Sequence, residues 1–88
     1  MTNNTEYLNE AREEMLKASL QGREQEIMHY QINIDNYTIA LDEIGKLPDD
    51  ERTELSGFAE QLTGLLASEK LEQKKAKIML AVIKRQLA

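Results

Sequence analysis

The sequence predicts an all-α protein, an antiparallel hairpin of two long helices that spans the 88-residue chain as a single domain. Two observations support this prediction. Apolar residues recur every three or four positions through most of the chain, which is the period of a helix face. The stretch IGKLPDD at residues 44–50 is the one strong interruption. It separates two segments of similar length, and a tight loop between matched helices favours antiparallel packing.

The first segment is expected to be helical over about 5–44. Asn3 followed by Glu6 fits a capping box, although Asn stands where Ser or Thr is usual. The apolar residues then fit four heptads, with Arg23 as the one exception. Leu20, Ile27, Ile34 and Leu41 occupy position a, and Leu16, Tyr30, Tyr37 and Ile44 occupy position d.

A strand is the competing interpretation for residues 28–44. Tyr30, Ile32 and Ile34 alternate with polar residues, and Asp35-Asn36 resembles a hairpin turn. The heptad repeat covers many more residues than this alternation, and the turn lacks the glycine that it prefers. We therefore expect a helix here.

The turn is expected at residues 45–48, with Gly45 in a left-handed conformation and Pro48 at the start of the next helix. Helix is then expected over about 49–67, followed by a third helix or a continuation over about 69–87. Ser68 fits a helix cap, and the apolar register shifts near it. The question of one helix or two therefore stays open.

More apolar residues are present than one helix contact requires. Met28, Ile32 and Ile39 lie nearly opposite the a/d stripe of the first helix. In the C-terminal segment, Ile78 and Val82 point one way and a second apolar set sweeps round the other side. The residues expected at a protein interface are Met28, Ile32, Ile39, Met79, Ile83 and Leu87.

Three arrangements would cover these surplus residues. The simplest is a homodimer that forms a four-helix-bundle-like assembly. The alternatives are a three-helix monomer folded at Ser68 and a surface kept for a foreign protein.

The net charge of −5 is unevenly distributed. Residues 1–69 carry fifteen acids and five bases, whereas residues 70–88 carry one acid and six bases. A basic helix beside acidic ones explains this asymmetry. A nucleic-acid site would use Lys70, Lys74, Lys75, Lys77, Lys84 and Arg85, but the acidic body repels phosphate and no aromatic residue is interleaved for base stacking. Conversely, an acidic nucleic-acid mimic would present Glu10, Glu13, Glu14, Asp49, Asp50, Glu51 and Glu54.

No motif predicts catalysis, a cofactor or a metal. The chain has no cysteine and one histidine, and it lacks a glycine-rich phosphate loop. Glu26 and His29 have the Glu-x-x-His spacing of di-iron bundles, but in this register His29 faces away from the core. No apolar run approaches the ~20 residues of a membrane span, so we expect a cytoplasmic protein with no membrane association.

These observations favour a non-enzymatic protein-interaction module that acts as an adaptor, inhibitor or regulator. In size and composition the chain resembles the small acidic helical accessory proteins of phages and prophages.

Overall fold

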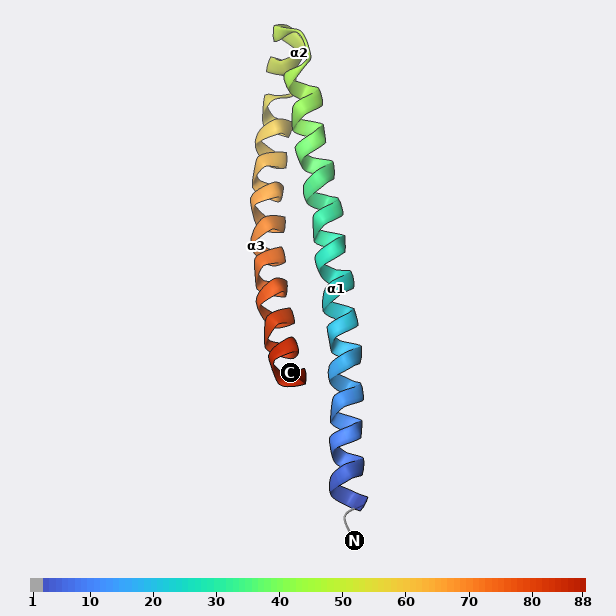
Figure 1. Cartoon of the computed structure of the whole chain (residues 1–88). Coiled ribbons are helices and arrows are strands. Elements are labelled where there is room, and N and C mark those ends of the chain that lie inside the picture. Colours follow the sequence, from blue (N-terminus) through green and yellow to red (C-terminus); the bar gives the residue numbers. More distant parts are fainter. Residues whose placement is uncertain (1–2) are drawn as a thin grey trace.

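The computed structural model describes the backbone of residues 3–88 and the side chains of residues 5–88. It contains α1 (Asn3–Gly45), α2 (Asp49–Glu54) and α3 (Ser56–Leu87). The two long helices lie side by side and run in opposite directions, and α2 lies at the end where the chain turns (Figure 1). The molecule measures 77 × 16 × 14 Å. No strand occurs in residues 3–88, so the all-α fold class is confirmed.

The turn between α1 and α2 is built differently from the expectation. Gly45 is the last residue of α1, and no glycine in the described chain has a positive φ. The predicted left-handed conformation of Gly45 is therefore wrong. The backbone N–H groups of Lys46 and Leu47 instead bond to the carbonyls of Glu43 and Ile44. These short bonds satisfy carbonyls at the end of α1 without a left-handed residue. The expected capping contact of Asn3 lies outside the described side chains.

The second segment is interrupted at Leu55 and not at Ser68. Pro48 precedes α2, whose first turn holds Asp49, Asp50 and Glu51 at the positive end of the helix dipole. Leu55, at φ −96° and ψ 7°, then separates α2 from α3. From Ser56 onward α3 continues through Ser68 to Leu87. Of the two alternatives left open at Ser68, the continuation is therefore confirmed, whereas a break there and a three-helix monomer folded at that residue are wrong. The helix expected over 49–67 is interrupted at Leu55.

The seam between α1 and α3 explains why Ser68 causes no break. On α1, every residue of the expected a and d positions is half-buried or buried, including Arg23, so this heptad register is confirmed. On α3 the seam uses one unbroken pattern of every third or fourth residue. Its members are Leu62, Leu66, Glu69, Gln73, Ala76, Leu80, Ile83 and Leu87. The register does not shift at Ser68, because polar Glu69 and Gln73 occupy seam positions there.

The inner and outer sides of the C-terminal segment are the reverse of the expectation. Ile83 is only 6 % exposed and packs towards α1, whereas Ile78 is 66 % exposed. Val82 also faces outward. The expectation followed the apolar residues alone, whereas the seam is set by helix periodicity that runs through polar positions.

The core of this chain is thin. Among the described residues only four hydrophobic side chains are buried, whereas twelve large ones are at least 40 % exposed. An isolated pair of helices with so little buried apolar surface has a small free energy of unfolding.

Gly64 lies within α3, and a Cβ added to it meets no atom within 4 Å. We expect Gly64→Ala to raise the free energy of unfolding by about 1 kcal/mol, because alanine loses less backbone entropy than glycine in a helix. Chemical denaturation at fixed protein concentration measures the change. The control is the reverse substitution, Ala67→Gly, at an exposed position of the same helix, which should lower the free energy of unfolding by a similar amount. A loss of stability in Gly64→Ala would contradict this prediction.

Candidate interaction surfaces

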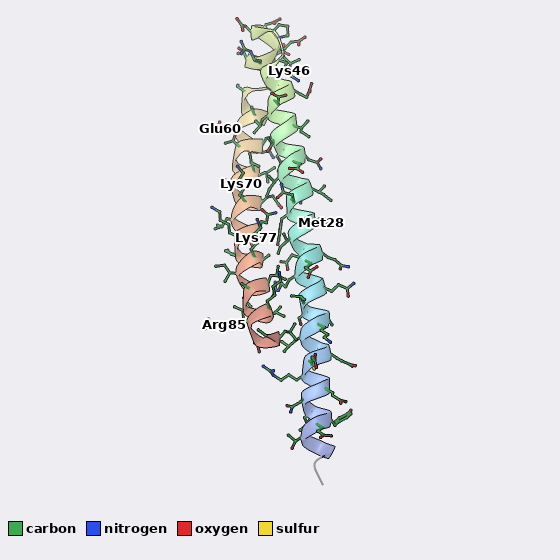
Figure 2. All side chains as sticks on the ribbon, viewed as in Figure 1. Met28, Lys46, Glu60, Lys70, Lys77 and Arg85 are labelled. Atoms are coloured by element: carbon green, nitrogen blue, oxygen red, sulfur yellow. The ribbon has the colours of Figure 1, made fainter. Side chains whose placement is uncertain are left out.

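The outer side of α1 carries three of the expected interface residues. Met28, Ile32 and Ile39 are each more than half exposed, on the side opposite the seam. Figure 2 shows Met28 on α1, with Lys70, Lys77 and Arg85 on α3. The expected position of these three apolar residues relative to the seam is therefore confirmed.

Ile32 and Ile39 belong to a longer pattern that the sequence reasoning missed. Taking every third or fourth residue from Leu8 to Ile39 defines a row along α1, which we call the uncharged stripe. Its members are exposed except for half-buried Ala11, and Gly22 also borders the groove between the two long helices. The row contains no Asp, Glu, Lys or Arg, although α1 carries nine acidic and three basic residues. Its members are Leu8, Ala11, Met15, Ala18, Gly22, Gln25, His29, Ile32, Asn36 and Ile39. The sequence contains this pattern as a second heptad row, but its small and neutral polar residues give the row little hydrophobicity.

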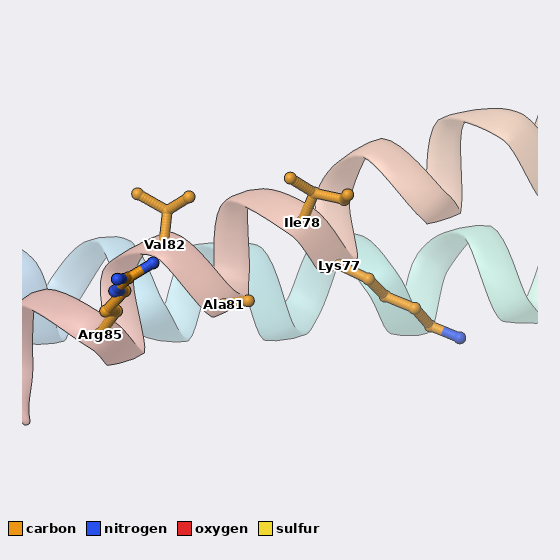
Figure 3. A pocket seen from close by; sticks show the side chains of 5 residues that line it. All are labelled: Lys77, Ile78, Ala81, Val82 and Arg85. Atoms are coloured by element: carbon orange, nitrogen blue, oxygen red, sulfur yellow. The ribbon is translucent and has the colours of Figure 1, made fainter.

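A second apolar area lies on the outer side of α3. Ile78, Ala81 and Val82 line a shallow groove of about 360 Å³, with Lys77 and Arg85 at its edges (Figure 3). Ile78 and Val82 project to one side of α3, and Lys77 extends away from them. This groove lies away from the seam and from the outer side of α1.

The other three expected interface residues do not form one surface with Ile32. Met79 is partly exposed at the edge of a groove of about 550 Å³ between the long helices, where Ser19 and Gly22 leave room on α1. Ile83 lines the same groove from inside the seam, and Leu87 is half-buried opposite Leu16. The packing of α1 against α3 therefore buries Ile83 and covers much of Leu87.

Polar contacts between the helices lie along the seam. The Gln73 amide donates to the Ile27 carbonyl at 3.2 Å and to Gln31 Oε1 at 2.9 Å. Asn33 donates to Glu69 at 3.2 Å. These bonds satisfy polar groups that would otherwise be costly to cover, and they favour one alignment of α1 against α3.

The ion pairs contribute little to this alignment. All six pairs in the described part of the chain join residues three or four apart, such as Lys17 with Glu13 at 3.2 Å. Most of their side chains are well exposed, and such pairs are worth at most about 1 kcal/mol. Hydrogen bonds to Asp42 and Glu43 raise the pKa of the Lys46 ammonium above its ordinary value.

The six basic side chains at the C-terminal end are exposed and are spread around α3. Lys70, Lys77 and Lys84 share one side of the helix at intervals of seven, whereas Arg85 lies about 100° round the helix from Lys84. Lys75 pairs with Glu72 at 3.0 Å. α3 has a net charge of +3 and lies along α1, which has a net charge of −6. Phosphate approaching these lysines therefore meets carboxylates on the neighbouring helix.

Glu26 has a structural partner on each side. Its carboxylate pairs with Arg23 at 2.9 Å and accepts a hydrogen bond from the Tyr30 hydroxyl at 3.3 Å. Partial burial, together with Glu26, raises the pKa of Tyr30 above its ordinary value. His29 is exposed, and its ring lies 6.4 Å from that of Tyr30. Within residues 5–88, no three His, Cys, Asp or Glu side chains are grouped as metal ligands would be.

None of the three described helices is both long and apolar enough to cross a bilayer.

The described chain combines one seam between two helices with apolar outer surfaces on both long helices. Comparisons with protein-family models, curated proteins and solved structures found no match.

Proposed function

We propose that this chain is a non-enzymatic protein-interaction module, an adaptor, inhibitor or regulator that acts by binding another protein. The exposed apolar side chains carry this proposal, since twelve large ones are exposed against four hydrophobic side chains that are buried. Exposed apolar side chains that adjoin one another on a protein surface are typical of binding sites for other proteins.

Self-association into a dimer with four long helices is part of the proposal. The chain has an accessible surface of 6903 Å². A compact monomer of 10.1 kDa is expected to expose roughly 5,300 Å². The excess is about twice the ~800 Å² that each partner buries in a standard interface. A second copy can therefore cover an ordinary interface and still leave apolar surface for a foreign protein.

The test is the molar mass in solution of the wild type and of the double variant Ile32→Glu, Ile39→Glu, measured by sedimentation equilibrium. The wild type is expected near twice the chain mass of 10.1 kDa, and the variant near the chain mass itself. Burying two carboxylates on each copy would cost more free energy than formation of the dimer interface releases.

The matched control is Gln21→Glu, Thr38→Glu, which adds the same charge to polar positions of α1 and should remain dimeric. Circular dichroism of all three proteins establishes that the helices persist. A wild type that sediments as a monomer would contradict self-association.

Nucleic-acid binding through the six basic residues, and acidic mimicry of nucleic acid, have weaker support. The basic row on α3 lies beside acidic α1, and the acidic residues are divided between α1 and α2. The apolar outer surfaces have no role in either function.

A further inference from the structure

The N-terminal end of α1 extends beyond α3 (Figure 1). Arg12 donates to Gln86 at 2.8 Å, so the last turn of α3 lies level with Arg12. Asn9 still borders the end of α3, but the preceding described side chains are exposed, with Tyr7 and Leu8 more than 60 % exposed. The side chains at this end of α1 are therefore open to contact with another molecule.

The uncharged stripe continues along this unpaired end and along the rest of α1. Its two halves differ in composition. The N-terminal half, from Leu8 to Gly22, contains three small residues, and the C-terminal half, from Gln25 to Ile39, contains only large ones. A surface of this kind fits a second copy of itself that runs in the opposite direction.

One antiparallel alignment matches every position of the stripe. Ile39 and Ile32 then face Leu8 and Met15 of the second copy, which gives apolar layers. The polar residues face the small ones. The three polar layers are Asn36 with Ala11, His29 with Ala18, and Gln25 with Gly22. The apolar layers lie towards the two ends of the pairing and two of the three polar layers lie around its centre, where neutral polar residues in a coiled-coil seam fix the alignment at a cost in stability. No charged group is buried in any of these layers.

We propose that two copies pair through the uncharged stripe, with the two α1 helices antiparallel and the two-fold axis passing between Gly22 and Gln25. The proposal rests on the self-association proposed above and specifies its surface. The unpaired end of each α1 lies against the C-terminal half of the other α1, and the two α3 helices lie outside. The apolar outer side of α3 stays open.

Charge gives this arrangement a distinctive salt dependence. Each α1 has a net charge of −6, so the two helices repel one another. Added salt screens that repulsion and is expected to increase the dimer fraction. A dimer that placed acidic α1 against basic α3 of the second copy would instead weaken with salt.

Disulfide trapping tests the alignment, since the chain has no cysteine of its own. One protein carries Ala11→Cys and another carries Asn36→Cys. Under mild oxidation, the mixture of the two proteins is expected to form a covalent dimer. Either protein alone is expected to form none, because the two-fold axis places each cysteine far from the same cysteine of the second molecule. The matched control mixes Glu10→Cys with Thr38→Cys, which lie at similar levels on another side of α1 and should not cross-link.

Sedimentation of the same proteins separates the possible failures. A dimeric mass without the 11–36 disulfide overturns this alignment and leaves self-association standing, whereas a monomeric wild type overturns both. A disulfide in either single variant alone indicates parallel pairing and also overturns the alignment. A second matched pair uses two exposed isoleucines, with Ile32→Glu expected to be monomeric and Ile78→Glu expected to remain dimeric.

Discussion

Replacing Ile83 with alanine is expected to lower the free energy of unfolding by about 2–5 kcal/mol, the cost of removing a buried branched side chain and leaving a cavity. Ile83 is 6 % exposed in the seam between α1 and α3. Only three other hydrophobic residues in the described chain are buried, so the loss is a large part of the total stability. Urea unfolding at fixed protein concentration, followed by circular dichroism, measures it.

Ile78→Ala is the matched control for this prediction. It makes the same chemical change five residues earlier in α3, at a side chain that is 66 % exposed. Its effect is expected to stay within about 0.5 kcal/mol. Equal losses in the two variants would contradict the assignment of Ile83 to the inner side of α3.

The second large effect is expected at Ala76, which is 2 % exposed and is the most completely covered of the buried hydrophobic residues. Ala76→Leu adds three heavy atoms where the two helices leave no space, so they must move apart or adopt strained rotamers. We expect a loss of about 1–3 kcal/mol. Thermal and urea unfolding both measure it.

Ala81→Leu provides the comparison, because Ala81 is exposed on the outer side of the same helix. Leucine there has open space and a helix propensity close to that of alanine, so stability should change little. A stable Ala76→Leu variant would indicate that the helices pack less closely at this level than the seam implies.

Helix α1 was predictable because its seam is apolar at almost every position. Ile27, Ile34 and Leu41 repeat at intervals of seven, and hydrophobic periodicity is the strongest structural signal in a single sequence. The exposure of Ile32 and Ile39 followed from the same register. Arg23 did not hide the pattern, because it is one exception in four heptads.

Helix α3 was less predictable, because polar residues occupy the middle of its seam. Gln73 is buried yet hydrogen-bonded to α1, and Glu69 accepts a bond from Asn33. A hydrophobicity pattern assigns these polar positions to the surface, because their hydrogen-bond partners lie on another helix, far away in the sequence. Hydrophobicity alone therefore does not distinguish the two sides of α3, since Ile78 is as apolar as Ile83 but lies outside the seam.

Local periodicity and a single interruption are enough to predict that this protein is helical, where its chain turns and which side of α1 packs inward. The side of α3 that faces α1 becomes evident only from the packed helices. That choice depends on polar contacts across the seam, where hydrogen bonds from Gln73 make a polar residue as acceptable as an apolar one. The packed helices also show that Ile83 packs inside, and that the N-terminal end of α1 extends past α3 with its uncharged stripe exposed.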